Sequence, residues 1–266
     1  MNIERRIGIV LGTAVIALAI TAPWFAADPA TTDFTAILSA PSMRNWLGTD
    51  QFGRDVLARI AGGGRISLLV AALATIIAGM IGTLLGVIAG AGKGVPAKLL
   101  SHFIDLCLAL PRVVVLLVLA AAVGRLEPVW MGVVLGATGW PAIARLVRGE
   151  AMRLSHSGHA EAARALGATP QRVITREILP GTFPAALVAL TLGVADVLLL
   201  EAGLAFLGIG IRPPAPTWGG MLLEAQGYMA DAPWLLFAPA GVLVAATAAA
   251  TLVGDSLRRR MLVRDQ

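Results

Sequence analysis

Four ionisable side chains fall inside apolar stretches of the chain, where charge is costly and therefore marks candidate functional positions. They are Asp105, Arg112, Asp196 and Glu201. Asp105 and Arg112 are seven residues apart, which is two helical turns, but Pro111 lies between them and is expected to disturb a shared face. Asp196 and Glu201 are five residues apart and therefore point to different faces. All four are candidates for lining a polar pathway.

The positions of the two acidic residues within their stretch suggest different surroundings. Glu201 is expected near the outer end, within reach of water, and Asp196 deeper. For Asp196 the sequence leaves open a structural hydrogen bond or ion pair and a place facing an aqueous passage. No recognisable motif joins Asp105, Asp196 and Glu201 into a catalytic group, which argues against an intramembrane enzyme.

Metal and hydrolase chemistry find little support in the sequence. His156 and His159 are three residues apart and close to Glu161, a spacing that a helical metal site can use, but no third ligand cluster follows. We therefore predict no metal site. The sequence contains no serine elbow, phosphate-binding loop or HExxH motif, so we do not expect the chain to hydrolyse ATP. Its single cysteine, Cys107, excludes an internal disulfide.

The elements that carry these residues are predicted to be membrane-spanning helices. Of 266 residues, 57% are hydrophobic and 14% charged, and the mean hydropathy is +0.80, outside the range of soluble domains. Windows long enough to cross about 30 Å of hydrocarbon occur at residues 7–27, 66–91, 103–123, 128–147, 184–204 and 234–254. The sequence thus predicts an all-α polytopic membrane protein with six transmembrane helices in one domain, residues 1–266.

The distribution of basic residues predicts the orientation. With both termini in the cytoplasm, fourteen of the twenty-one Lys and Arg residues lie inside. Six lie outside: Arg44, Arg54, Arg59, Arg65, Arg125 and Arg212. The same scatter argues against nucleic-acid binding despite the net charge of +5. The first window is longer than the apolar part of a typical signal peptide, which favours a retained anchor over a cleaved segment.

A stripe of small residues marks the second window. Alanine or glycine recurs at every fourth position, at Ala74, Ala78, Gly82, Gly86 and Gly90. This spacing puts them on one helical face, where another backbone can approach closely. The face is expected to contact protein rather than lipid. Internal packing, a heterodimer seam and pore lining all remain open.

A charged segment, EAARALGATPQRVITREILP at residues 161–180, interrupts the apolar windows. Its first residues favour a helix with Glu161 in the first turn, and Gly167 is placed to end that helix in a left-handed conformation. Thr169 is then expected to cap a second helix with Pro170 at its first position. That helix should end before Pro180. The segment is predicted to be a two-helix hairpin.

This segment resembles the EAA loop of permease subunits in ATP-binding-cassette (ABC) importers. Further motifs are similar to the second, C-type permease of the dipeptide, oligopeptide and nickel group. They are LGTDQFGRDVL at 47–57, GRISL at 64–68, EAGLAFLGIG at 201–210, PPAPTWG at 213–219 and GDSLR at 254–258. The resemblance covers nearly the whole chain and implies a type I importer permease fold. It also implies an outer loop at 28–65, a cytoplasmic EAA coupling loop at 148–183 and an outer loop at 205–233.

The resemblance assigns roles to two sets of residues. ATPase coupling falls to Glu161, Ala162, Ala163, Gly167, Leu179 and Pro180. Ala163 and Gly167 are four residues apart, and their small size is expected to allow close approach on one face. The outer-loop family motif comprises Gly48, Asp50, Gly53, Arg54 and Asp55. Its charged members are expected to fix the loop through local ion pairs or to contact a binding protein.

The resemblance also implies partners. These are a second permease subunit in a heterodimer, two ATP-binding subunits that bind ATP and Mg, and an extracytoplasmic substrate-binding protein. The chain itself would bind no cofactor and would lie in the bacterial inner membrane. Dipeptides or oligopeptides are the expected cargo, with nickel or a metal chelate as the alternative. A stand-alone channel or secondary transporter would not explain the hairpin.

Two features depart from the family pattern. Glu177 stands where the family usually has a histidine, and the C-terminal tail is short. The first changes the local charge at the expected ATPase contact, and its effect on the partner remains open. Neither feature affects the predicted class.

Overall fold

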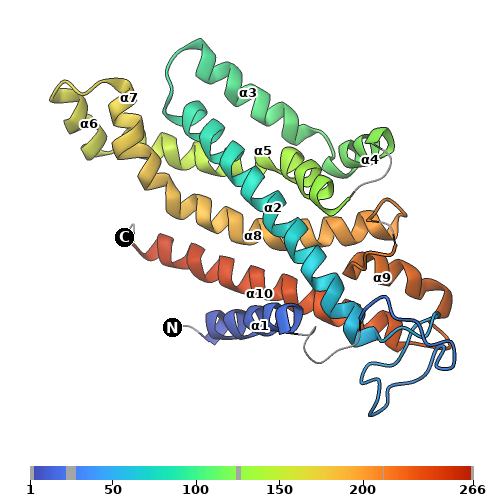
Figure 1. Cartoon of the computed structure of the whole chain (residues 1–266). Helices are drawn as coiled ribbons and strands as arrows, with labels where there is room; N and C mark the ends of the chain where they lie inside the picture. The colour runs from blue at the N-terminus through green and yellow to red at the C-terminus, as the bar shows by residue number, and fades with distance from the viewer. Residues whose placement is uncertain (1–2, 22–27, 124–126, 212, 265–266) are drawn as a thin grey trace. The chain divides into compact units, whose positions relative to one another are not determined.

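A computed structural model describes residues 3–21, 28–123, 127–211 and 213–264. These residues form helices joined by loops, with one isolated antiparallel bridge between Thr49 and Asp55 (Figure 1). The helices are α1 (Ile3–Thr21), α2 (Val56–Ala91), α3 (Val95–Ala109), α4 (Arg112–Val123), α5 (Pro128–Ser155), α6 (Gly158–Ala165), α7 (Pro170–Val173), the π-helix η2 (Ile174–Ile178), α8 (Leu179–Phe206), α9 (Trp218–Ala225), the 3-10 helix η3 (Gln226–Tyr228) and α10 (Trp234–Arg264). The predicted all-α membrane fold is confirmed.

Among the described residues, four helical segments are long and apolar enough to cross a membrane. They are Val56–Ala91, Pro128–Ser155, Pro170–Phe206 and Trp234–Arg259. The pair α3 and α4 would make a fifth span, bent by 81° where Leu110 is extended and Pro111 follows. α1 covers the start of the first predicted window, and residues 22–27 lie outside the described part of the chain. The count of six stays a prediction.

Both predicted outer loops contain helical residues. Outer loop 28–65 was expected to run up to the second window, but α2 already begins at Val56. It begins there because the carboxylate of Asp55 accepts a hydrogen bond from the amide of Ala58 at 2.8 Å, which caps the helix. Outer loop 205–233 contains α9, which is capped by Thr217. Arg125 and Arg212, both predicted to be outside, lie outside the described residues.

The chain divides into two compact units, and the boundaries between them fall within α2, α4, α5, α8 and α10. Unit 1 comprises residues 1–72, 117–132 and 194–253, and unit 2 comprises residues 73–116, 133–193 and 254–266. The core of unit 1 joins the first turns of α2 to α9 and the start of α10 through Val56, Ile60, Met221, Ala225 and Leu235. The prediction of one domain stays a prediction.

The core of unit 2 is built on the predicted small-residue stripe. A side chain at Gly82 would meet the carbonyl of Trp140 in α5 at 2.8 Å, and one at Gly86 would meet the carbonyl of Ala144 at 2.6 Å. A side chain at Gly90 would overlap the carbonyl of Arg148. These approaches are too short for any Cβ atom. The stripe therefore packs inside the chain, against α5, which decides between the three possibilities that the sequence left open.

Candidate functional site

The charged segment forms the expected hairpin of α6 and α7. α6 begins after Ser157, whose hydroxyl accepts a hydrogen bond from the amide of Ala160 at 3.4 Å. Glu161 lies in the first turn, where its charge favours the positive end of the helix dipole. The sequence analysis missed the Ser157 cap, although a serine just before a helical run is a recognised start signal.

Gly167 ends α6 in the way predicted. Its φ is +83°, the left-handed conformation that glycine adopts without strain. Its amide donates to the carbonyl of Arg164 at 2.9 Å, and the amide of Ala168 donates to the carbonyl of Ala163 at 3.0 Å. Together these bonds make a Schellman motif, which satisfies the last carbonyls of the helix and fixes the turn.

The second arm of the hairpin starts as predicted but does not end as predicted. Thr169 accepts a hydrogen bond from the amide of Arg172 at 3.3 Å, with Pro170 at the first helical position. The helix was expected to stop before Pro180, yet it continues through that residue as η2 and then α8. The π-helical turn explains the difference, because the amide of Leu179 bonds back five residues to Ile174 and the widened turn leaves room for the proline ring. The hairpin is therefore continuous with α8.

One face of the hairpin is fixed to the rest of unit 2. Ala160, Val173 and Ile178 are buried in a cluster that also contains Val147 and Ala151 of α5. The guanidinium of Arg164 donates to the carbonyl of Ser155 at 2.7 Å, which ties α6 to the end of α5. These contacts hold the hairpin rigidly on its supporting helices.

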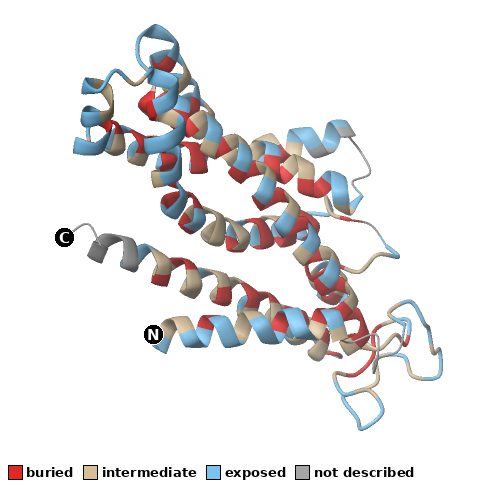
Figure 2. Cartoon of the chain, turned by 60° about the vertical axis from the view of Figure 1, so that its left-hand side comes forward, coloured by how far each residue is buried: buried red, intermediate tan, exposed pale blue. Residues whose placement is uncertain are grey.

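The opposite face of the hairpin is open, as the largely exposed colouring of α6 and α7 shows (Figure 2). Glu161, Ala162 and Gly167 are exposed, whereas Ala163 is half-buried and packs against the core cluster. Ala163 and Gly167 therefore differ in exposure, and their close approach to a partner on one face stays a prediction. Leu166, which the sequence analysis did not single out, is 89% exposed at the tip of the hairpin. An apolar side chain so exposed next to a rigid turn is a candidate contact for a partner.

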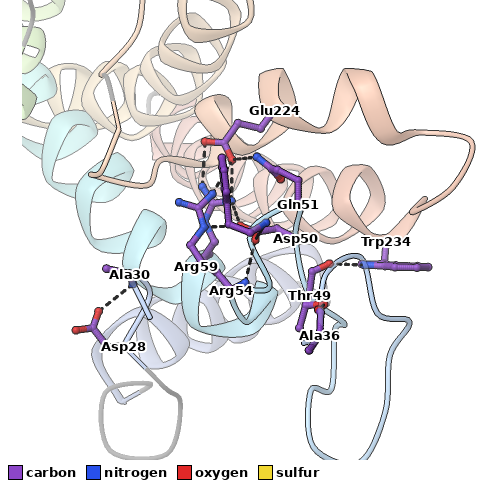
Figure 3. Close-up of polar contacts among 11 residues, drawn as sticks. Asp28, Ala30, Ala36, Thr49, Asp50, Gln51, Arg54, Arg59, Glu224 and Trp234 are labelled. Atoms are coloured by element: carbon purple, nitrogen blue, oxygen red, sulfur yellow. Dashed lines mark hydrogen bonds and ion pairs between the residues drawn. The ribbon is translucent and has the colours of Figure 1, made fainter. Parts of the chain in front are cut away.

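The outer-loop motif surrounds a buried carboxylate in unit 1 (Figure 3). Asp50 accepts bonds from the guanidinium groups of Arg54 and Arg59, both at 2.6 Å. Glu224 of α9 accepts from Arg59 at 2.8 Å and from Arg54 at 3.3 Å. The ion pair expected of Asp50 and Arg54 is present, and it extends to two residues that the sequence analysis did not connect with it. This network ties the loop to α9.

Two glycines of the motif allow close backbone approach. Gly48 has a φ of +75°, and a side chain there would lie 2.7 Å from the indole nitrogen of Trp234. Gly53 has a φ of +71°, and a side chain there would overlap the backbone of Asp33. Asp55 caps α2, and its carboxylate also accepts a hydrogen bond from the side-chain amide of Asn45 at 2.8 Å. The motif thus builds the fold of the outer loop.

The two intramembrane ionisable residues of unit 2 bond to α5 at different points. Asp105 pairs with Arg148 of α5 at 3.2 Å, and Arg112 donates to the carbonyl of Leu135 at 2.8 Å. The bend between α3 and α4 removes the shared helical face that a straight span would have given Asp105 and Arg112. Asp196 is exposed on the isolated chain.

Glu201 was expected to reach water, and this expectation is wrong: its side chain is 0% exposed. One carboxylate oxygen accepts a hydrogen bond from the hydroxyl of Ser67 in α2 at 3.4 Å. The same hydroxyl accepts a hydrogen bond from the backbone amide of Trp218 at 3.3 Å. The indole of Trp218 donates to the carbonyl of Ile60 at 2.9 Å, so the start of α9 covers the carboxylate. The sequence could not show this cover, because Trp218 is far from Glu201 along the chain.

Comparison with known proteins identifies the class of this chain. Residues 82–263 match the family described as binding-protein-dependent transport system inner membrane component. The chain belongs to this family. It is a permease subunit of an ABC importer, a multi-pass membrane protein whose relatives work in complexes with other permease, ATPase and binding-protein subunits.

Two relatives extend the match to most of the chain. A protein of Brucella suis biovar 1, provisionally named a peptide permease protein, is 40% identical over 255 residues, which cover 94% of this chain and 84% of that protein. A glutathione transport system permease protein of Pectobacterium atrosepticum is 34% identical over 227 residues, which cover 85% of this chain and 75% of that protein. The predicted family of the permease is confirmed.

Proposed function

We propose that this permease subunit carries short peptides, and that its α6–α7 hairpin is the coupling element that receives the motion of an ATP-binding subunit. The names of the relatives support peptide cargo, since one is named for peptides and another for the tripeptide glutathione. These names do not favour the nickel alternative. The observation that carries the coupling role is the shape of the hairpin, which is rigid on one face and open on the other.

The contact with the ATP-binding subunit centres on the tip of the hairpin. Leu166 lies at the end of α6 and is 89% exposed, and Glu161 and Ala162 of the same hairpin are also exposed. An apolar side chain on a fixed turn fits a groove in a partner with little loss of conformational entropy, because the Schellman turn has already fixed the backbone. Glu177, also exposed, adds a negative charge to the second arm of the hairpin.

Force passes from the hairpin to the membrane through a continuous helix. Because η2 leads into α8 without a break, a displacement of α7 also displaces Leu179, Pro180 and the span that follows. The bond from Arg164 to Ser155 joins the same hairpin to α5. Closure of the ATP-binding subunits would therefore move two spans together, which is the motion that alternating access requires.

The rest of the complex follows from this role. We infer a heterodimer with a second permease subunit, two ATP-binding subunits that hold ATP and Mg, and an extracytoplasmic binding protein. The chain is placed in the inner membrane of a bacterium with both termini in the cytoplasm, and it takes no catalytic part itself. The excess of basic residues on the assigned cytoplasmic side supports this orientation.

Substitutions at Gly167 test the coupling role. Gly167→Pro forces φ to about −65° where the turn needs +83°, and Gly167→Ala introduces a strain of about 1–2 kcal/mol. Gly158→Ala is the matched control, since a side chain at either glycine meets no atom within 4 Å but only Gly167 has a positive φ. Transport by the reconstituted complex should be lost in Gly167→Pro, reduced in Gly167→Ala and normal in Gly158→Ala.

A charge reversal provides a second test of the same contact. Glu161→Lys puts a cation at the positive end of α6 and should uncouple ATP hydrolysis from transport while membrane insertion stays normal. The coupling role would be refuted if Gly167→Pro and Glu161→Lys both transported peptide at the rate of the unaltered complex.

A further inference from the structure

The outer loop 28–65 lines an open pocket that the coupling mechanism does not use. Its volume is about 660 Å³, and its lining includes Asp33, Met43, Arg44, Asn45 and Trp46. Pockets of this size are typical of small-molecule sites. All of its lining residues belong to unit 1.

The pocket carries a pair of opposite charges. The guanidinium of Arg44 lies 3.6 Å from carboxylate oxygen Oδ2 of Asp33, and the Arg44 side chain is 84% exposed. The other oxygen of Asp33 accepts bonds from the hydroxyl and the amide of Thr35. These bonds hold the pKa of Asp33 below its usual range, so the carboxylate is ionised at neutral pH. Oδ2 remains available for a second cation.

Large apolar side chains stand beside this charge pair. Met43 is 94% exposed and Trp46 is 66% exposed, although both line the pocket. Exposed apolar groups of this size around a pocket commonly mark a binding site. The unbranched Met and the flat indole can contact side chains of different shapes, which suits a ligand whose backbone is constant and whose side chains vary.

The floor of the pocket is fixed before any ligand arrives. Asn45 is bonded to Asp55 at 2.8 Å, and the amide of Thr49 donates to the carbonyl of Ser39 at 3.0 Å. Gly53 lies directly against the backbone of Asp33. A fixed floor lowers the entropy cost of binding.

We propose that this pocket binds a zwitterionic peptide of two or three residues, with its α-ammonium group at Asp33 and its α-carboxylate at Arg44. The charge pair selects for such a ligand. A ligand with both charges can pair with Asp33 and Arg44 at once, which a simple anion or cation cannot do. The proposal rests on the proposed peptide cargo and places a peptide site on the permease itself.

The test is calorimetric titration of the assembled transporter in lipid nanodiscs, without its binding protein, with alanyl-leucine. Asp33→Asn and Arg44→Gln should each weaken binding at least tenfold. Asp28→Asn is the matched control for the carboxylate, because Asp28 lies in the same loop and is absent from the pocket lining. Arg172→Gln is the control for the arginine. Both controls should bind within twofold of the unaltered protein.

Modified ligands test the pocket without altering the protein. N-acetyl-alanyl-leucine, which lacks the ammonium group, and alanyl-leucine amide, which lacks the carboxylate, should each bind at least tenfold more weakly. Trp46→Phe should remove most of the tryptophan fluorescence change on binding. Equal affinity for all three ligands, or binding that both pocket substitutions leave unchanged, would overturn the proposal. The coupling role would survive that result, because the Gly167 substitutions test it separately.

Discussion

Asp50 organises the outer loop from a position where water does not reach it. Its two carboxylate oxygens accept bonds from the backbone amides of Phe52 and Arg54 as well as from the guanidinium groups of Arg54 and Arg59. The sequence motif showed that Asp50 and Arg54 are close, because they are four residues apart. It could not show Glu224, which completes the network from another part of the chain.

Replacing the Asp50 carboxylate with a neutral side chain should destabilise the folded protein. Asp50→Asn leaves the buried guanidinium of Arg59 with half of its counter-charge, and removing one partner of a buried pair costs about 3–5 kcal/mol. The expected result is a reduction of that size in the free energy of unfolding, measured by denaturant titration in detergent micelles.

A partly exposed pair on the same chain serves as the control. Glu150 and Arg153 are paired at 2.6 Å, and the Arg153 side chain, which would lose its partner, is 54% exposed to water. Glu150→Gln should lower the free energy of unfolding by less than about 1 kcal/mol. If Asp50→Asn and Glu150→Gln lowered the free energy of unfolding by similar amounts, burial would not explain the contribution of Asp50 to stability.

At the scale of elements, the close packing of α2 on α5 depends on the absence of side chains. The four-residue spacing predicted the packing face of α2, since that period follows from helix geometry. The partner helix was not predictable, because the contact joins residues that are distant in the chain. The path of the chain through Pro180 also escaped prediction, because a π-helical turn depends on backbone bonds rather than on residue type.

Adding one methyl group should separate α2 from α5. Gly86→Ala places a Cβ 2.6 Å from the carbonyl of Ala144, and overpacking of this kind costs about 1–3 kcal/mol. The thermal midpoint of the purified protein should fall accordingly. Gly149→Ala in α5 meets no atom within 4 Å and should leave the midpoint unchanged or raise it. Equal effects of the two substitutions would argue against close packing at Gly86.

At the scale of the whole molecule, the family and the helical architecture follow from the sequence, whereas the assembly does not. Composition and periodicity reflect the surroundings of each helix, so they indicated the membrane and the positions of most spans. The faces that meet a second permease or a binding protein depend on those partners, whose surfaces this sequence does not encode.

The orientation in the membrane has a direct test. In a Cys107→Ser background, Thr32→Cys in outer loop 28–65 should react with a membrane-impermeant maleimide in intact spheroplasts. Leu166→Cys at the tip of the hairpin should react only after the membrane is permeabilised. The reverse pattern of labelling would contradict the assignment of both termini to the cytoplasm.

The central claim is that the α6–α7 hairpin contacts an ATP-binding subunit, and site-specific photo-crosslinking tests it most directly. A p-benzoylphenylalanine at position 166 of the assembled, transport-active complex should crosslink to the ATP-binding subunit. The same group at position 32, in outer loop 28–65, should not. An active complex that gives no crosslink from position 166, or equal crosslinking from both positions, would contradict the account.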